Sequence, residues 1–393
     1  MSEEAPVTRE RHYKPGDPIR IGMVGGGKDA FIGAVHRHAA RLDGKYQFVA
    51  GALSSTPERS RESGAALGLA PDRCYATFEE MADREARRFD GIEAVSIVTP
   101  NHMHYAAAKP FLSRGIHVIC DKPLTSTLED AKGLVALAEA SRSLFILTHN
   151  YTGYPMVRQA REMIAAGRIG KIRVVQVEYA QDWLTIAEEN KQAAWRTDPA
   201  RTGLGGSTGD IGTHAFNLAC FVTGLEVESL AADIQAFVPG RQVDDNAHVM
   251  LRFAGGARGM LWCSQVAPGN ENGLRIRVYG ESGGLEWAQE DPNYLTYTPF
   301  GAPQQLITRG GAGAGEAANR VTRIPAGHPE GYLEGFANIY AEAAEAIIAA
   351  RTGARVSDDV LYPTVLDGLR GVQFISACVA SSTQNAAWID LDH

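Results

Sequence analysis

The sequence predicts an α/β chain of two domains. We expect a doubly wound parallel sheet in the first 150 residues and a predominantly antiparallel α+β domain in the rest. Three observations support this. The 393 residues exceed the roughly 250 to 300 at which a single core stops growing. Short apolar runs alternate with helical patterns up to about residue 150, and longer strands with hairpin-like turns follow.

Five apolar runs mark the strands expected in the first domain: IRIGMVG (19–25), FVAGAL (48–53), AVSIVTP (94–100), HVIC (117–120) and LFILT (144–148). Strand and helix in alternation predict right-handed crossovers and therefore a parallel sheet. The helix expected at 128–141 has apolar residues at 131, 134, 135 and 138, a stripe that would lie on that sheet. We assign this domain to residues 1–150, with 1–17 as an N-terminal extension.

The second domain, assigned to residues 151–393, is expected to begin with a helix at about 155–166. Its strands are expected at 172–180, 230–238, 247–255, 257–266 and 274–280, with FAGGAR as the clearest hairpin turn. The segment RGGAGAGEAANR (309–320) is too poor in apolar residues to form core and predicts a long loop. A closing helix is expected from about Pro329.

Composition argues against several classes of protein. A hydrophobic content of 45% and a charged content of 21% are typical of soluble globular proteins, and no run of 18 apolar residues is present to span a membrane. A net charge of -8 supplies no basic face for nucleic acid. The polar N-terminus has no apolar segment of the secretory type, so we expect a cytoplasmic location. Five scattered cysteines, never in C-x-x-C spacing, favour neither a disulfide framework nor a zinc site, and no metal is expected.

A glycine-rich turn follows the first expected strand. Glycines at a strand-to-helix turn let the backbone approach a pyrophosphate, and the next helix N-terminus offers free N–H groups. Gly25, Gly27 and Ala30 fit G-x-G-x-x-A, although Gly33 is an alternative helix-packing glycine in a longer loop. Any tight turn also accepts glycines, but the position on the first strand favours a dinucleotide-binding Rossmann domain. The residues expected to contact the cofactor here are Gly25, Gly26, Gly27, Ala30, Phe31 and Ile32.

The end of the second strand bears on the choice between NAD and NADP. An acidic residue there usually holds the ribose hydroxyls of NAD. This chain instead has Ser54 and Ser55, with Arg59 soon after, and these groups would hydrogen-bond and pair with a 2′-phosphate. The sequence therefore favours NADP over NAD. In the alternative interpretation, Arg59 is a solvated helix residue facing Glu58 or Glu62.

Two later strands end in polar residues at the same edge of the expected sheet. Ligands of open α/β sheets bind beyond the carboxyl ends of the strands, so residues 99–104 and 121–123 are expected to line the cofactor. The residues assigned to it are Thr99, Pro100, Asn101, His104, Asp121, Lys122 and Pro123. Asn101 is equally plausible as a helix N-cap. A purely structural lysine would extend into water, whereas Lys122, fixed by the following proline, is expected to point into the crevice.

A second glycine-rich turn, GGSTGDIGTHAFN (205–217), precedes an expected helix in the second domain. Asp210 and His214 are four residues apart and therefore lie on one helical face. A lone histidine is more often a core or surface residue than a catalytic one. The pairing with an acid after such a turn favours a catalytic pair.

Together these residues resemble the Gfo/Idh/MocA family of oxidoreductases, over nearly the whole chain from Ile19. The most specific features are Asp121-Lys122-Pro123, where the family usually has Glu-Lys-Pro, and the Asp-x-Gly-x-His element that ends at His214. The chain departs from the family in its longer glycine loop and in Leu204, at the first position of a frequent glycine triplet. The resemblance implies that Lys122, Asp210 and His214 are catalytic. It also implies that the second domain is a large open sheet that joins subunits into a homo-oligomer, a dimer or a tetramer.

The residue types suit oxidation of a secondary alcohol of a sugar, inositol or related cyclic polyol by an NAD(P)-dependent dehydrogenase. His214 would take the hydroxyl proton, Lys122 would hydrogen-bond the substrate oxygen, and Asp210 would orient the hydroxyl or the histidine. Further substrate contacts, chosen by position alone, are Tyr151, Tyr154, Arg161, Trp195 and Arg196. Alternatives are a reductase of a small carbonyl compound, a dihydrodiol dehydrogenase, or a non-catalytic NADP-binding sensor.

Overall fold

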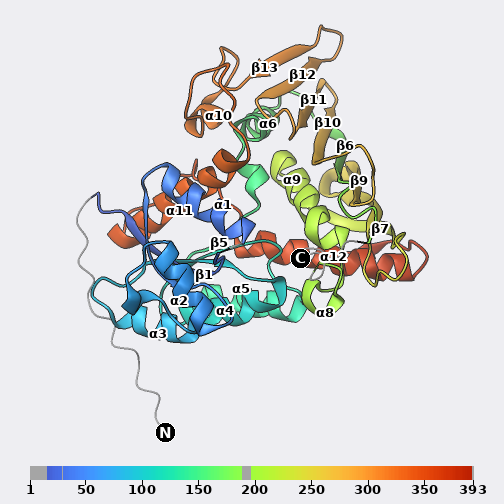
Figure 1. Cartoon of the computed structure of the whole chain (residues 1–393). Helices are drawn as coiled ribbons and strands as arrows, with labels where there is room; N and C mark the ends of the chain where they lie inside the picture. Colours follow the sequence, from blue (N-terminus) through green and yellow to red (C-terminus); the bar gives the residue numbers. More distant parts are fainter. Residues whose placement is uncertain (1–15, 29, 188–195, 392–393) are drawn as a thin grey trace. The chain divides into compact units, whose positions relative to one another are not determined.

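The computed structural model describes residues 16–28, 30–187 and 196–391 (Figure 1). The chain divides into two compact units. Of the described residues, the first unit contains those up to 124 together with 129–148 and 336–366, and the second contains 125–128, those of 149–335 and those from 367. The first unit therefore includes the late segment 336–366, which lies outside the range 1–150 that the sequence suggested for the first domain.

The first unit is built on a parallel sheet of five strands in the order β2-β1-β3-β4-β5. The strands are β1 (Ile19–Gly25), β2 (Tyr46–Ala52), β3 (Ala94–Val98), β4 (His117–Cys120) and β5 (Phe145–Leu147). This confirms the doubly wound sheet. The strand order reverses between β1 and β3, so a ligand is expected beyond the carboxyl ends of these two strands.

Helices connect the strands of this sheet. They are α1 (Phe31–Leu42), α2 (Pro57–Ala66), η1 (Pro71–Arg73), α3 (Phe78–Arg87), η2 (Asn101–Met103), α4 (His104–Leu112) and α5 (Leu128–Ser141), and most of α11 (Tyr332–Thr352) also belongs to this unit. Local interactions stabilise both ends of α3. The side chain of Thr77 caps its N-terminus by accepting a hydrogen bond from the backbone N of Glu80, and arginines in its last turn interact favourably with the helix dipole. In α5 the expected stripe is largely buried at Ala131, Leu134 and Ala138.

The second unit contains a nine-stranded, mostly antiparallel sheet in the order β13-β12-β11-β10-β6-β9-β8-β7-β14 (Figure 1). Its strands are β6 (Ile172–Ala180), β7 (Val227–Gln235), β8 (Asn246–Phe253), β9 (Arg258–Ser264), β10 (Gly273–Gly280), β11 (Gly283–Ala288), β12 (Tyr294–Pro299), β13 (Gln305–Thr308) and β14 (Ile389–Asp390). Among the described strands of this sheet, β6 and β9 alone pair in parallel. The large open sheet is therefore confirmed.

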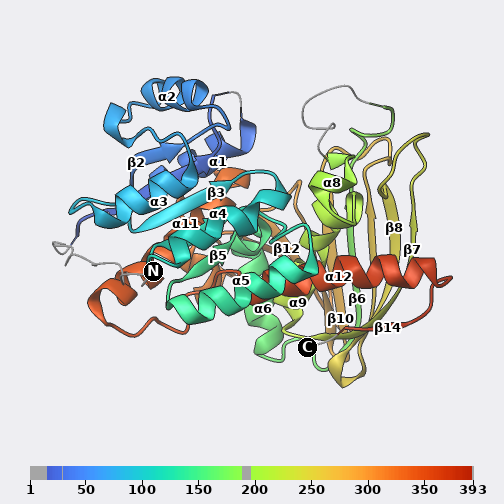
Figure 2. The ribbon, with the colours of Figure 1, turned by 90° about the horizontal axis from the view of Figure 1, so that it is seen from below.

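Helices cover one face of this sheet. The helical segments are η3 (Asn150–Gly153), α6 (Pro155–Ala165), α8 (Pro199–Thr202), η4 (Thr208–Gly212), α9 (Thr213–Thr223), η5 (Ala254–Gly256), α10 (Glu316–Arg320) and α12 (Val365–Thr383). Figure 2 shows α12 lying across the strands, and Ser381 Oγ in α12 accepts a hydrogen bond from Ala232 N in β7. Alternate residues of β6, such as Val175 and Val177, are buried beneath the helices, which gives the period-two pattern of a sheet with one covered face.

The sequence missed part of this unit. The strands β11, β12 and β13 were not predicted, and residues 316–320 of the expected loop form the short helix α10. The buried Arg309 holds the segment: it donates hydrogen bonds to Asn293 Oδ1 (2.8 Å), Ile324 O (2.7 Å) and Glu330 Oε1 (2.9 Å). A compact segment without many apolar residues is possible here because buried polar groups replace a hydrophobic core.

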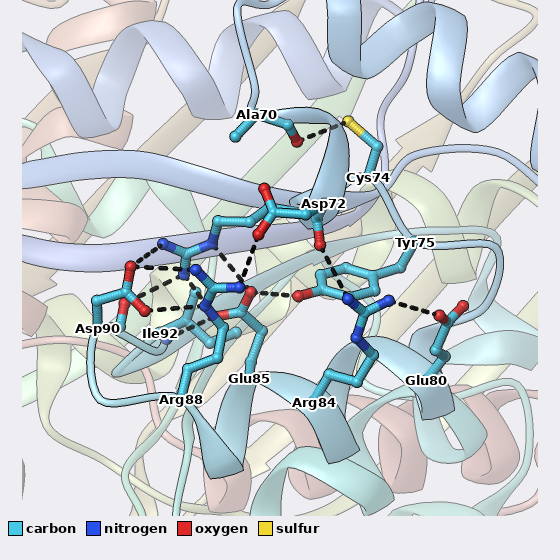
Figure 3. Close-up of polar contacts among 11 residues, drawn as sticks. Ala70, Asp72, Cys74, Tyr75, Glu80, Arg84, Glu85, Arg88, Asp90 and Ile92 are labelled. Carbon is cyan, nitrogen blue, oxygen red and sulfur yellow. Dashed lines mark hydrogen bonds and ion pairs between the residues drawn. The ribbon is translucent and has the colours of Figure 1, made fainter.

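A buried ionic cluster stabilises the first unit between β2 and β3 (Figure 3). The carboxylate of Glu85, which has no exposed surface, accepts hydrogen bonds from the Arg73 guanidinium, from Tyr75 OH (2.6 Å) and from Ile92 N (3.0 Å). Arg73 also pairs with Asp90 at 3.4 Å. Because Glu85 is removed from water, its charge depends on these donors. Burial and the hydrogen bond to Glu85 raise the pKa of Tyr75.

Replacing Arg73 is expected to destabilise the first unit strongly. The change Arg73→Ala leaves the Glu85 carboxylate buried without its cation, which should lower the free energy of unfolding by about 3–5 kcal/mol. The matched control is Arg355→Ala, because the Arg355–Asp358 pair is 84% and 88% exposed and should contribute less than about 1 kcal/mol. Urea denaturation followed by circular dichroism measures both, and equal small effects of the two changes would contradict the prediction.

Candidate functional site

The turn after β1 is restricted to glycine by direct backbone contact. Gly25 and Gly26 have φ values of +76° and +67°, which side chains disfavour. A Cβ on Gly25 would lie 2.8 Å from the carbonyl oxygen of Val98, and one on Gly27 would lie 2.6 Å from that of Leu53. The loops after β1, β2 and β3 therefore meet without intervening side chains, as a cradle for a pyrophosphate requires.

The structure decides between the two interpretations of the glycine motif. A Cβ on Gly33 would lie 2.4 Å from the Cα of Gly26, so Gly33 is the helix-packing glycine and the turn is the longer one. Ala30 is the N-cap of α1, and its N donates to Gly27 O at 3.1 Å. Phe31 is exposed and Ile32 half-buried, and their contacts with a cofactor stay predictions.

The end of β2 presents hydroxyl groups and a cation. Ser54 is half-buried, and Ser55 and Arg59 are exposed. Glu58 pairs with Arg61 at 3.2 Å instead of Arg59, and Arg59 makes no ion pair with any residue that the structure describes. The arginine is therefore available to a ligand at this edge of the sheet.

At the end of β3, the buried imidazole of His104 joins two loops. Its Nε2 lies 2.9 Å from Thr99 O, and its Nδ1 lies 2.9 Å from Pro123 O. Burial lowers the pKa of His104, so the ring is neutral at pH 7 and donates to one carbonyl at a time. This geometry gives His104 a role in holding the loop after β4, and a direct contact with the cofactor stays a prediction. Asn101 lies inside η2, whose N-cap is Pro100.

Asp121, the acid before Lys122, is held in place by hydrogen bonds of its backbone and of its side chain. Asp121 N donates to Ile97 O at 2.9 Å, Thr148 Oγ1 donates to Asp121 Oδ1 at 3.0 Å, and the Lys122–Pro123 peptide bond is cis. His36 Nε2 lies 3.8 Å from Asp121 Oδ1, a distance of electrostatic attraction and too long for a hydrogen bond. Burial raises the pKa of Asp121, but His36 and Lys122 lower it more, to about 2. The carboxylate is therefore ionised beside Lys122 at neutral pH.

The ring of His36 is itself held from within the first unit. Its Nδ1 lies 2.9 Å from Tyr340 OH and 3.2 Å from Ser96 Oγ, and Tyr340 OH donates to Ser96 Oγ at 3.0 Å. Tyr340 belongs to the late segment 336–366, so that segment completes the support of Asp121. The sequence analysis did not find His36, because nothing near it in the chain marks its partner 304 residues away.

In the second unit, one carboxylate anchors the glycine-rich turn. Asp244 accepts hydrogen bonds from Gly206 N (2.7 Å), Ser207 Oγ (2.6 Å), Thr208 N (2.8 Å) and Thr208 Oγ1 (2.8 Å). The turn continues into η4, a π-helical turn that precedes α9. Such turns are frequent at functional sites.

The carboxylate of Asp210 projects from this π-helical turn. Its Oδ2 accepts hydrogen bonds from Arg196 Nε at 3.1 Å and Gln265 Nε2 at 2.9 Å, and its side chain is 13% exposed. The predicted residues Asp210 and Arg196 are thus brought together. Gln265, at the end of β9, was not predicted.

The imidazole of His214, at the start of α9, is enclosed by other rings. Its Nδ1 lies 3.4 Å from Nδ1 of His149, and the rings of Tyr151 and Tyr179 lie at 4.8 Å and 6.2 Å between centroids. Tyr151 OH and Tyr179 OH are 2.5 Å apart. Tyr151 was predicted, whereas His149 and Tyr179 were not. The only local signal for His149 was its position directly after the strand LFILT.

A polar network extends from these tyrosines. Asn272 Oδ1 accepts from Tyr179 OH and Gln181 Nε2, both at 2.8 Å, and Asn272 Nδ2 donates to Gln289 Oε1 at 2.9 Å. Gln289 Nε2 lies 3.4 Å from Tyr154 OH, so the buried Tyr154 joins the network.

One predicted substrate residue, Arg161, is engaged elsewhere, and another is not described by the structure. Arg161 donates to the carbonyl of Phe221 and stacks over its ring at 4.8 Å, so its guanidinium is used within α6 and α9 instead of the His214 cluster. Trp195 lies outside the described residues.

Residues 16–28, 30–187 and 196–391 contain neither a cluster of metal ligands nor a membrane-spanning helix. No group of three or more His, Cys, Asp or Glu side chains in those ranges is arranged to hold a metal ion. Within the same ranges, no helix combines the length and the hydropathy needed to cross a bilayer.

Known proteins share this architecture. An oxidoreductase from Sinorhizobium meliloti is 65% identical, covers 95% of this chain and 99% of its own, and has a TM-score of 0.88. An inositol dehydrogenase homologue from Azotobacter vinelandii, solved with NADH and myo-inositol, is 38% identical over 95% and 98% of the two chains, with a TM-score of 0.88. A levoglucosan dehydrogenase, solved with NADH and levoglucosan, is 26% identical over 96% and 100%, with a TM-score of 0.81.

Family models match both units. Residues 19–149 match the model described as the oxidoreductase family with an NAD-binding Rossmann fold. Residues 157–286 match the GFO/IDH/MocA C-terminal domain. The matched ranges cover more than half of the chain and contain Lys122, Asp210 and His214. The chain belongs to the Gfo/Idh/MocA family of oxidoreductases.

Proposed function

We propose that this chain is an NAD(P)-dependent dehydrogenase that oxidises a secondary hydroxyl of a cyclic polyol or sugar. His214 takes the hydroxyl proton, Lys122 donates a hydrogen bond to the same oxygen, and Asp210 orients the hydroxyl. The nicotinamide cofactor supplies the hydride acceptor when bound. Family membership and the NADH complexes of the Azotobacter protein and of levoglucosan dehydrogenase support the oxidoreductase activity.

The observation that carries this proposal is the setting of His214. A buried imidazole, hydrogen-bonded at Nδ1 and enclosed by two tyrosine rings, is oriented as a general base has to be. Asp210 lies four residues before it, in the π-helical turn that Asp244 anchors. A histidine with only a structural role would not account for Asp210 and its two side-chain donors in the same segment.

The polar network supports a polyhydroxylated substrate. Asn272, Gln181 and Gln289 are side-chain amides, which both donate and accept hydrogen bonds and so complement hydroxyl groups. An aromatic dihydrodiol has fewer hydroxyl groups and would form fewer hydrogen bonds with these amides. Related proteins solved with myo-inositol and with levoglucosan support the same substrate class.

For the cofactor, we propose that the chain accepts NADP as well as NAD. The residues present fit a dinucleotide, because the Gly25–Gly27 turn offers a cradle that any Cβ would fill. Ser54, Ser55 and Arg59, which makes no ion pair with a described residue, support binding of a 2′-phosphate, and the adjacent Glu58 pairs with Arg61 at 3.2 Å. The Azotobacter and levoglucosan complexes contain NADH, so NAD is the competing preference.

We also propose that the chain forms a homo-oligomer through the outer face of the large sheet. The paired residues Met250 and Met260 are 52% and 50% exposed there, and the paired Val174 and Tyr279 are 39% and 42% exposed. Burying such a face between copies removes apolar surface from water. A single-chain mass by light scattering would contradict this proposal. The cytoplasmic location stays a prediction from the sequence.

Loss of either Lys122 or His214 is expected to reduce turnover. With myo-inositol and NAD(P), His214→Ala should lower kcat by about 10²- to 10⁴-fold, the usual contribution of a general base. Lys122→Ala should lower it by about 10²- to 10³-fold, through loss of a donor to the developing alkoxide. Both variants should still bind NADH in a fluorescence titration.

The matched controls replace the same residue types at exposed positions. Lys132→Ala in α5 and His248→Ala in β8 should leave kcat within a factor of about two of the unsubstituted chain. Full turnover in either site variant would disprove its assigned role. Tight cofactor binding without turnover on any of a broad set of polyols, sugars and dihydrodiols would instead indicate a sensor.

Arg59 is expected to contribute to binding of the 2′-phosphate of NADPH. Arg59→Ala should weaken NADPH binding by roughly tenfold and leave NADH binding unchanged, because only NADPH has a phosphate to pair with the arginine. Arg61→Ala, which removes the partner of Glu58, is the control and should affect both cofactors little. Parallel fluorescence titrations measure this, and a preference for NADH that Arg59→Ala does not alter would disprove it.

A further inference from the structure

The two buried histidines of the second unit form a direct pair. His149 follows β5 and precedes η3, and His214 is the second residue of α9. Their Nδ1 atoms are 3.4 Å apart, their rings cross at 80°, and the residues are 2% and 6% exposed. In a hydrogen bond between two imidazole nitrogens, one carries the proton and the other the lone pair. The contact therefore links the tautomers of the two rings.

The backbone around His149 is fixed independently of its ring. His149 O accepts hydrogen bonds from Thr152 N at 3.2 Å and from Thr152 Oγ1 at 2.9 Å. The position of the ring is thus set by the η3 turn and by packing within the buried cluster. A substitution that changes only the ring leaves these backbone contacts in place.

Other titratable groups surround the pair. Tyr151 from η3 and Tyr179 from β6 present their rings to His214, and their hydroxyls hydrogen-bond each other. Burial raises the pKa of both phenols, so they remain neutral across the working pH range. The ion pair of Asp210, from η4, with Arg196 also belongs to this neighbourhood, and Asp210 Oδ2 accepts a second hydrogen bond from Gln265.

We propose that His149 is a positioning residue for His214, an inference that rests on the proposed function. Nδ1 of His149 accepts a hydrogen bond from Nδ1–H of His214, which fixes the ring orientation and places the basic lone pair on Nε2. The tautomers are assigned from this hydrogen bond. His149 thus does for His214 what a carboxylate does for the histidine of a hydrolase triad.

The role follows from the proton balance of the oxidation. The substrate O–H bond breaks and its proton goes to Nε2 of His214, while the C–H bond breaks, its electron pair leaves as hydride, for which the nicotinamide cofactor would be the acceptor, and the carbon–oxygen double bond forms. His214 is then an imidazolium in a buried site, where an isolated charge is costly. Its Nδ1–H donates to the neutral His149, which stabilises the protonated state.

The test compares His149→Phe with His149→Asn. Phenylalanine keeps a ring but has no acceptor, whereas the asparagine amide oxygen lies near the position of Nδ1 and can accept the hydrogen bond. With myo-inositol and NAD(P), His149→Phe should lower kcat by about ten- to a hundredfold with KM changed less than about threefold. His149→Asn should retain most of the activity.

The pH profile separates this role from a purely structural one. Loss of the acceptor disfavours protonated His214, so the base stays deprotonated to lower pH. The acidic limb of kcat/KM should therefore move by about one pH unit to lower pH in His149→Phe and stay in place in His149→Asn. Equal losses in both variants with an unchanged pH profile would overturn the proposal, as would full activity of His149→Phe.

The role of His214 and its pairing with His149 can be disproved separately. If His214→Ala keeps full turnover, the proposed function fails and the pair falls with it. If His214→Ala is inactive and His149→Phe behaves like the unsubstituted chain, only the pairing is disproved. Should His149→Phe fail to bind NADH, His149→Ala is assayed with and without added imidazole, where recovery of turnover supports the pairing and its absence counts against it.

Discussion

The functional part of the second unit depends on the hydrogen bonds that the carboxylate of Asp244 accepts. Four hydrogen bonds from residues 206–208 converge on it, and these residues lead directly into the π-helical turn with Asp210 and the helix that begins before His214. A Cβ on Gly206 would lie 2.0 Å from Asp244 O, so the turn tolerates only glycine at this position. Local rigidity of this kind is what a general base requires, because a misplaced base loses most of its effect.

In the first unit, different groups hold the segment that contains Lys122 in place. Lys122 follows the ionised Asp121, which is held by Thr148 and faces His36, and the next carbonyl is bound by His104. None of these supports is exposed enough for water to replace it freely, so the polar contacts are made at low dielectric and are correspondingly strong. In the first unit, buried polar groups hold the residue just before Lys122 and the carbonyl just after it, and in the second unit Asp244 holds the turn that leads into η4 with Asp210.

The sequence was sufficient to predict the residues whose role follows from a strand or helix end. Gly25, Lys122 and His214 all lie at such positions, and alternation of strands and helices indicated the sheet that places the first two. The supports were not predictable. His149 lies 65 residues from His214, Asp244 lies 36 residues from Thr208, and Tyr340 lies 304 residues from His36, and no local pattern records such pairings. The strands β11 to β13 were missed because they are only four to six residues long, and β11 and β12 each alternate over just two buried side chains, which is too short a pattern to predict a strand.

The most direct test of the proposed function is a crystal structure of the chain with NADH and myo-inositol bound. The central claim is that Lys122 and His214 act on one substrate oxygen. It predicts that Lys122 Nζ and Nε2 of His214 both lie within about 3.2 Å of a single hydroxyl oxygen. Myo-inositol bound with no hydroxyl oxygen contacted by both residues would contradict the account.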